Sequence, residues 1–144
     1  MTLVELLVVL AVIGLVIGIG VPALLNYGQQ VRLKTTARQL MGLILFARQR
    51  AIASRAEHAV VVDLEARKVT VVDLGSGEVQ EQRLDLPSSI SIDVQVGGES
   101  MQEPQLVFRP TGSMKGRTTT VVLANTERQH TITALAATGA VFIE

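Results

Sequence analysis

The hydrophobic pattern of the chain changes twice, and each change marks a different kind of element. Residues 6–25 form a nearly continuous apolar run in which sixteen of twenty side chains are hydrophobic. Between 29 and 56, apolar residues recur every three or four positions, as on an amphipathic helix. After residue 56 the period falls to two, which indicates β-strands joined by antiparallel connections. The pattern predicts an α+β fold in which a long N-terminal helix packs its second half on an antiparallel β-sheet head.

The apolar run is long enough to cross a membrane as a helix. Twenty residues span about 30 Å, which is the hydrocarbon thickness of a bilayer, and no charge falls between Glu5 and Arg32. A signal peptide fits less well, because no basic segment precedes the run and no small-residue cleavage site follows it. A buried core helix is the other alternative, but a head this small could not cover every face of it. We therefore expect a membrane-spanning helix.

Three residues inside the run bear on helix packing. Gly14 and Gly18 form a pair of small residues that permits close contact between helices in lipid. Pro22 lacks a backbone donor and clashes with the preceding turn, so we expect a bend or opening between Gly18 and Pro22.

Glu5 places a carboxylate at the start of this apolar run. A charge costs about 2.5–3.5 kcal/mol at the centre of a membrane helix and less near its end. Glu5 could therefore reach the headgroups and interact with the helix dipole. Alternatively it pairs with an α-ammonium group, either its own or that of a neighbouring copy. Elementary physics leaves both interpretations open.

The charges that flank the apolar run predict a membrane topology with the head on the cytoplasmic side. Arg32, Lys34 and Arg38 follow the span and no base precedes it, so the positive-inside rule would put the head in the cytoplasm. That prediction fails if a basic leader once preceded Met1.

The second half of the helix carries an apolar stripe and an excess of positive charge. Segment 29–60 has a net charge of +5 and segment 61–105 a net charge of −6. The basic helix could bind a nucleic acid or a membrane surface. Alternatively, the basic and acidic segments could complement each other within one subunit or between subunits, and we favour this second interpretation. The stripe consists of Ala37, Leu40, Met41, Ile44, Ala47 and Ala51. The bases that lie mostly off it, on a predicted solvated face, are Arg38, Arg48, Arg50 and Arg55.

The remainder of the chain predicts about seven short strands. The first two are Val-rich and separated by three residues, which is typical of a hairpin. We expect two functional parts: an assembly half of the helix, 1–28, and a head, 29–144, that comprises the amphipathic helix 29–56 and the strands. The predicted strands are 58–64, 68–74, 90–96, 106–109, 118–123, 129–135 and 140–143.

No constellation of residues in the chain points to catalysis. The chain has no cysteine, which excludes a thiol nucleophile, a disulfide framework and a zinc knuckle. His58 and His130 are isolated and are expected at strand ends, and no serine lies in a nucleophile elbow. The acidic residues Glu78, Glu81, Asp85 and Asp93 are spread along the head. We expect no catalytic residues, no metal and no cofactor, and therefore not an enzyme.

The N-terminus resembles the mature N-terminus of type IV pilins and type II secretion pseudopilins. The matching residues are the segment MTLVE, with Glu5, the apolar run, and Pro22. The resemblance implies that a prepilin peptidase removed a short basic leader and that the new N-terminus, Met1, is methylated. It also implies a single-pass protein of the bacterial inner membrane with its head in the periplasm. In that family, Glu5 pairs with the N-terminal amine of an adjacent subunit during assembly, which here is the amine of Met1.

Three further segments resemble the GspH/FimT group of minor pilins. They are ARQRAIASR at 47–55, FRPTG at 108–112 and TGAV at 138–141. Pro110 and Gly112 suit a shaped turn, because proline fixes φ and glycine permits a positive φ. The absence of an Asp-rich C-terminal calcium loop favours a minor subunit and argues against a metal. The resemblance implies a structural subunit of a type II secretion pseudopilus or a type IV pilus, which joins other pilin-like subunits in a fibre, helps to initiate or cap it, and promotes protein secretion.

The alternative is a FimT-like minor pilin that binds DNA for natural transformation. Segment 106–144 has a net charge of +2, and its candidate contacts are Arg109, Lys115, Arg117 and Arg128. DNA-binding members of the group carry an arginine-rich stretch after the final turn, where this chain reads GAVF at 139–142.

Overall fold

The computed structural model describes residues 2–101, 104–126 and 128–143, apart from the side chains of residues 20–26, 80 and 81. The chain divides into two compact units, Met1–Arg32 and Leu33–Glu144. The functional boundary predicted between residues 28 and 29, which separates an assembly part from the head, stays a prediction.

The first unit is formed by the N-terminal part of α1, a helix that extends from Leu3 to Ser54. Its large apolar side chains between Leu3 and Ile19 are 47% to 75% exposed. Among the residues whose side chains are described, no helical stretch is long and apolar enough to cross a membrane. The helix is assigned without a break through Gly14, Gly18 and Pro22, and the bend predicted near Pro22 stays a prediction.

The predicted apolar stripe is confirmed in the second unit. Five of its six residues are at most 1% exposed, and Met41 packs against the core while partly exposed. The helix ends at Ser54, and Arg55 adopts a left-handed backbone conformation with φ 55°. This conformation commonly terminates helices.

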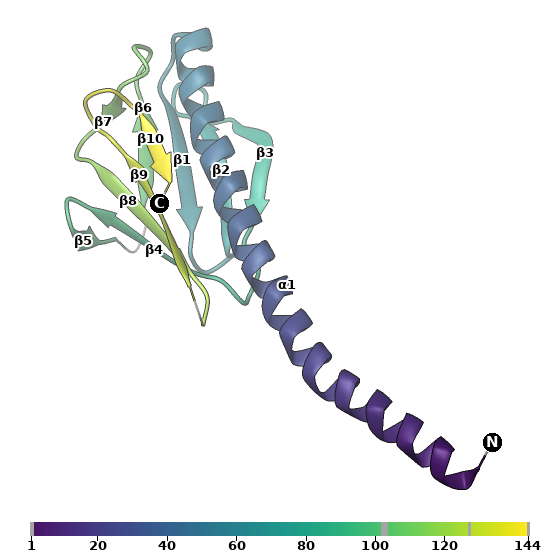
Figure 1. Ribbon diagram of the computed structural model, residues 1–144. Helices are drawn as coiled ribbons and strands as arrows, with labels where there is room; N and C mark the ends of the chain where they lie inside the picture. The colour runs from purple at the N-terminus through teal and green to yellow at the C-terminus, as the bar shows by residue number, and fades with distance from the viewer. Residues whose placement is uncertain (1, 102–103, 127, 144) are drawn as a thin grey trace. The chain divides into compact units, whose positions relative to one another are not determined.

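The head contains two antiparallel sheets that share one core with α1 (Figure 1). Sheet A has the order β3-β2-β1-β6-β7, and sheet B has the order β10-β9-β8-β4-β5. The strands of sheet A are β1 (His58–Asp63), β2 (Lys68–Asp73), β3 (Val79–Asp85), β6 (Gln105–Phe108) and β7 (Met114–Lys115). The strands of sheet B are β4 (Ser91–Val96), β5 (Glu99–Ser100), β8 (Thr119–Ala124), β9 (Gln129–Ala134) and β10 (Val141–Ile143).

All seven predicted strands are present within one or two residues of their predicted bounds, and β1 and β2 form the predicted hairpin. The described residues contain three further strands, β3, β5 and β7. β5 and β7 have only two residues each, which is too short to leave a periodic pattern. β3 reads VQEQRLD, with a single β-branched residue, and it forms because the edge of β2 pairs with it.

Arg67 holds the β3–β4 segment, which is one of the connections between the two sheets. Its backbone has a positive φ of 53° in the β1–β2 turn, which points the side chain toward the segment between β3 and β4. The guanidinium donates hydrogen bonds to the carbonyl oxygens of Leu86 (3.4 Å), Pro87 (2.6 Å) and Ile90. These carbonyls lie where the chain leaves sheet A for sheet B, so one cation holds the crossover.

Replacing Arg67 with Ala should therefore lower the free energy of unfolding by about 2 kcal/mol, because buried carbonyls lose a charged donor. Arg83→Ala, on the exposed part of β3, is the matched control and should change it by less than about 0.5 kcal/mol. Urea unfolding of the detergent-solubilised chain, followed by circular dichroism, measures both. Equal losses for the two variants would contradict the role of Arg67.

Candidate functional site

The start of α1 is closed by a reciprocal pair of hydrogen bonds between Thr2 and Glu5. The Glu5 backbone N–H donates to the Thr2 hydroxyl oxygen (3.2 Å), and the Thr2 N–H donates to the Glu5 carboxylate (3.1 Å). This is a capping box, which satisfies two N–H groups at a helix start. Within a single chain, Glu5 thus has a structural partner that the sequence analysis did not find, although T-x-x-E is its signature. The pairing of Glu5 with Met1 of a neighbour stays a prediction, and Met1 lies outside the described residues.

The three segments that resemble the GspH/FimT group meet at one point in the head. Arg48, on α1, donates from Nε to the Gly112 carbonyl oxygen (3.0 Å) and from Nη2 to the Thr138 carbonyl oxygen (3.1 Å). Gly112 belongs to the turn between β6 and β7, and Thr138 to the turn between β9 and β10. One side chain therefore joins the helix to a turn of each sheet. We call these three residues and Gly139 the Arg48 junction.

The turns of the Arg48 junction require glycine. Gly112 and Gly139 have φ values of 79° and 63°, so the positive φ predicted for Gly112 is confirmed. A Cβ on Gly139 would lie 2.1 Å from the Gly112 carbonyl oxygen, and one on Gly112 would lie 2.8 Å from Cδ1 of Ile52. The motifs thus encode a close backbone approach, and they contain no carboxylate, histidine or cysteine.

The prediction that Arg48 belongs to a solvated helix face is wrong. Its side chain is half-buried and bonds two carbonyls. Elsewhere in the described head, Lys115 pairs with Glu57 (3.2 Å), and His58 lies 3.8 Å from Asp73. The hydrogen-bond acceptors of Arg48 are backbone carbonyl oxygens, whereas the charge pattern of the sequence had suggested carboxylates.

His58 and Asp73 form a small polar cluster at the start of β1 and the end of β2. His58 is buried, and its Nδ1 lies 3.3 Å from the Ala56 carbonyl oxygen. The backbone N–H of Gly75 lowers the pKa of Asp73, helped by the Ser76 N–H and the charges of His58 and Arg50, while desolvation opposes them. A lowered pKa means that Asp73 stabilises the fold above its ordinary pKa and loses that effect as the pH falls through the lowered value. The cluster serves the β2–β3 turn.

One of the four candidate DNA contacts, Arg128, lies apart from the other three. Arg109 lies in the β6–β7 turn, and Lys115 pairs with Glu57. Arg117 packs beside Gly97, ahead of β8. Arg128 lies beyond the other end of β8, a distance of about 17 Å for six residues of strand.

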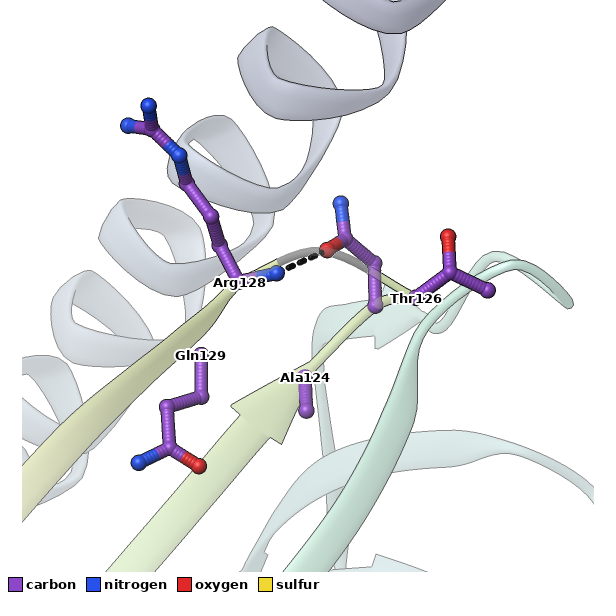
Figure 2. Close-up of a pocket in the computed structure, with 5 residues that line it drawn as sticks. Ala124, Thr126, Arg128 and Gln129 are labelled. Atoms are coloured by element: carbon purple, nitrogen blue, oxygen red, sulfur yellow. Dashed lines mark hydrogen bonds between the residues drawn. The ribbon is translucent and has the colours of Figure 1, made fainter.

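Arg128 also borders an open depression of about 270 Å³ at the β8–β9 turn (Figure 2). The Arg128 backbone N–H donates to the Asn125 side-chain oxygen (2.7 Å), and the Asn125 N–H donates to the Arg128 carbonyl oxygen (2.9 Å). Figure 2 shows the guanidinium extending away from Ala124 and Gln129. The described lining residues include no acid, histidine or cysteine, and the depression lies at a hairpin turn. Among the described residues, no three His, Asp or Glu side chains are grouped to hold a metal.

The close approach at the Arg48 junction predicts a difference between two glycines with positive φ. Gly139→Ala should lower the free energy of unfolding by at least about 3 kcal/mol, since a methyl group would displace the Gly112 carbonyl and break its bond to Arg48. Gly77→Ala is the control, because Gly77 has a φ of 72° but no atom within 4 Å of its added Cβ. We expect a cost of about 1 kcal/mol there. Urea titration of both variants tests this, and equal costs would show that φ alone matters.

The comparisons with known proteins show the family of the chain. Residues 36–138 match the family described as type II transport protein GspH, a range that includes all residues of the Arg48 junction except Gly139. No curated protein sequence matches the chain significantly.

Solved structures show the same fold. The type IV minor pilin FimU of Pseudomonas aeruginosa superposes with a TM-score of 0.64 at 15% identity, covering 82% of this chain and 92% of that one. The minor pseudopilin EpsH from the Type 2 Secretion System of Vibrio cholerae gives 0.63 at 18% identity, covering 78% and 96%. A second EpsH structure gives 0.64 at 19% identity, covering 78% and 92%. The chain belongs to the GspH family of type II transport proteins and is a structural subunit of the minor pseudopilin type, not an enzyme.

Proposed function

We propose that this chain is a minor subunit of a secretion pseudopilus, anchored in the bacterial inner membrane by residues 6–25 before it joins other pilin-like subunits. The family to which it belongs is named for type II transport, which favours secretion over a type IV pilus. Its role in this proposal is to initiate or cap the fibre and so to promote protein secretion. Maturation by a prepilin peptidase and methylation of Met1 belong to the same proposal.

The exposed apolar surface of the first unit supports the membrane anchor. Side chains all around the helix between Leu3 and Ile19 are exposed, and such a surface is stable only in lipid or against other apolar helices. The proposal takes the whole run 6–25 in the sequence, which extends beyond the described side chains. Lipid would cover this surface before assembly, and neighbouring helices would cover it in the fibre.

The position of Glu5 carries the proposal. In a single chain its carboxylate accepts a neutral N–H from Thr2. The ammonium group of an arriving subunit is a stronger partner, because charge-assisted hydrogen bonds are roughly twice as strong as neutral ones. In an apolar surrounding that gain increases, so Glu5 would exchange its own cap for a neighbour and fix the axial register.

Glu5→Gln separates the two roles of Glu5. Glutamine can complete a capping box but has no charge, so we expect the helix and head to remain folded while incorporation into sheared fibres falls at least tenfold. Thr2→Ala is the matched variant, because it removes the hydroxyl cap and keeps the charge. It should still be incorporated. Normal incorporation of Glu5→Gln, measured by immunoblot of fibres, would overturn the assembly role.

The separated bases predict weak nucleic-acid binding. Because Arg128 lies at the other end of β8 from Arg117 and Lys115 is already paired with Glu57, we expect the purified chain not to retard duplex DNA in a gel at physiological salt. Retardation that weakens steeply with salt and is lost in the Arg109→Ala, Lys115→Ala double variant would revive the DNA-uptake alternative.

A further inference from the structure

The side of α1 that points away from the core stays exposed in the second unit. With 3.6 residues per turn, Thr35, Gly42 and Gln49 lie along one line on that side, and all three are exposed. They are seven residues apart, which is the spacing at which two helices pack along each other. We define the outer face of α1 as the part of this side that consists of Lys34, Arg38, Gly42, Leu45, Phe46 and Arg50.

Gly42 leaves a gap in the middle of the outer face. It is exposed, and a Cβ added there would meet no neighbouring atom within 4 Å, so packing within the described chain does not require glycine at this position. Glycine inside a helix costs about 1 kcal/mol relative to alanine. One turn further on, Leu45 and Phe46 flank the gap and keep part of their apolar surface exposed while they pack against the core. A gap beside apolar side chains admits a second helix at close range.

The charges of the outer face have one sign. Lys34, Arg38 and Arg50 are exposed, and their side chains form no hydrogen bond or ion pair with any residue that the structure describes. No aspartate or glutamate occurs between Glu5 and Glu57, so the helix offers these bases no acid of its own. The outer face therefore combines an apolar gap with unpaired positive charge.

The same charges exclude α1 of a second copy as the neighbour. Two copies anchored in one membrane place their helices side by side and in the same direction. Because the helix carries bases and no acid between Glu5 and Glu57, bases meet bases at every axial offset, and like charges across a contact repel. The neighbour that fits the outer face is therefore a different chain.

Lipid headgroups and nucleic acid fit the outer face less well than a helix does. Lys34 and Arg50 lie about 24 Å apart along the helix axis, whereas the headgroup layer of a bilayer is only about 5–8 Å thick. A helix that stands on the membrane brings at most one of them to that layer. A nucleic acid would neutralise the bases but would leave Gly42, Leu45 and Phe46 without an apolar partner.

We infer that the outer face binds an acidic α-helix of a different pilin-like subunit, which packs against Gly42 and places carboxylates beside Lys34, Arg38 and Arg50. Lys34 and Arg38 are one turn apart, and Arg50 lies about 18 Å beyond Arg38, so the acids of the partner helix follow the same spacing. Because the partner belongs to the same fibre, this contact rests on the proposed function. A subunit with such a face lies beside a different subunit and does not extend a fibre by binding itself.

A charge-reversed copy of this chain supplies a partner helix for the test. The Lys34→Glu, Arg38→Glu double variant is the probe, and it keeps Arg50, which lies within electrostatic range of Asp73. The natural sequence has no cysteine, so Gln49→Cys is introduced into both the natural chain and the probe. The two chains carry tags of different size and are reconstituted together in phosphatidylcholine vesicles. A bis-maleimide that spans about 10 Å matches the distance of about 8–10 Å between packed helices.

A control probe carries the same change of charge elsewhere in the head. Lys68→Glu, Arg83→Glu reverses two exposed bases of sheet A. We expect mixed dimers to be at least five times more abundant with the probe than with the control probe, and high salt should reduce them. Gly42→Leu in the natural chain should abolish the mixed dimer by filling the gap, while the circular dichroism spectrum stays unchanged.

Equal crosslinking of the two probes would overturn this inference, because net charge alone would then account for the dimers. Dimers of the natural chain that are as abundant as mixed dimers would overturn it in favour of a second copy. Mixed dimers that disappear when phosphatidylglycerol is added to the vesicles would assign the face to lipid headgroups instead. Glu5→Gln in both chains should leave the mixed dimer intact, because the contact lies in the second unit. Loss of the dimer in Glu5→Gln would overturn this inference but not the proposed function, which incorporation into fibres tests.

Discussion

The head of this protein depends on one guanidinium group. Arg48 reaches from α1 to carbonyl oxygens in two turns, one in each sheet, and each oxygen would otherwise lose part of its solvation without a charged donor in return. Gly112 and Gly139 make this geometry possible, since any side chain on Gly139 would occupy the place of the Gly112 carbonyl. The helix, the β6–β7 turn and the β9–β10 turn therefore specify one another.

Arg67 makes the same kind of contact at the β3–β4 connection between the sheets, where it donates to three carbonyls. A carboxylate partner would bring its own desolvation cost, whereas a carbonyl at the end of a strand already needs a donor. The two turns and the β3–β4 connection are thus held by bonds to carbonyls, without using the opposite charges of 29–60 and 61–105 against each other. The remaining surface charges stay available to neighbouring subunits, which suits a protein of a fibre-forming family.

Local pattern predicted much of this fold. The stripe on α1, the β1–β2 hairpin and the positive φ of Gly112 each follow from the spacing or chemistry of adjacent residues. β3 could not be found in this way, because its sequence becomes a strand only when β2 presents an edge to it.

The role of Arg48 was equally inaccessible, since its partners lie 64 and 90 residues away and are backbone atoms without a sequence signature. For Glu5 the family resemblance implied a partner outside its own chain, and the structure shows one inside it, Thr2. The two are compatible, because a helix cap can be exchanged for a stronger charge when subunits meet.

Amide hydrogen exchange in an Arg48→Met variant tests the central claim most directly. Methionine keeps much of the apolar contact and removes the donor. We predict that the Gly139 N–H, bonded to Leu135, and the Met114 N–H, bonded to Ala136, exchange at least tenfold faster, while the β1–β2 amides keep their protection. Unchanged exchange at Gly139 and Met114, or equal acceleration throughout the head, would contradict the claim that Arg48 holds the two turns together.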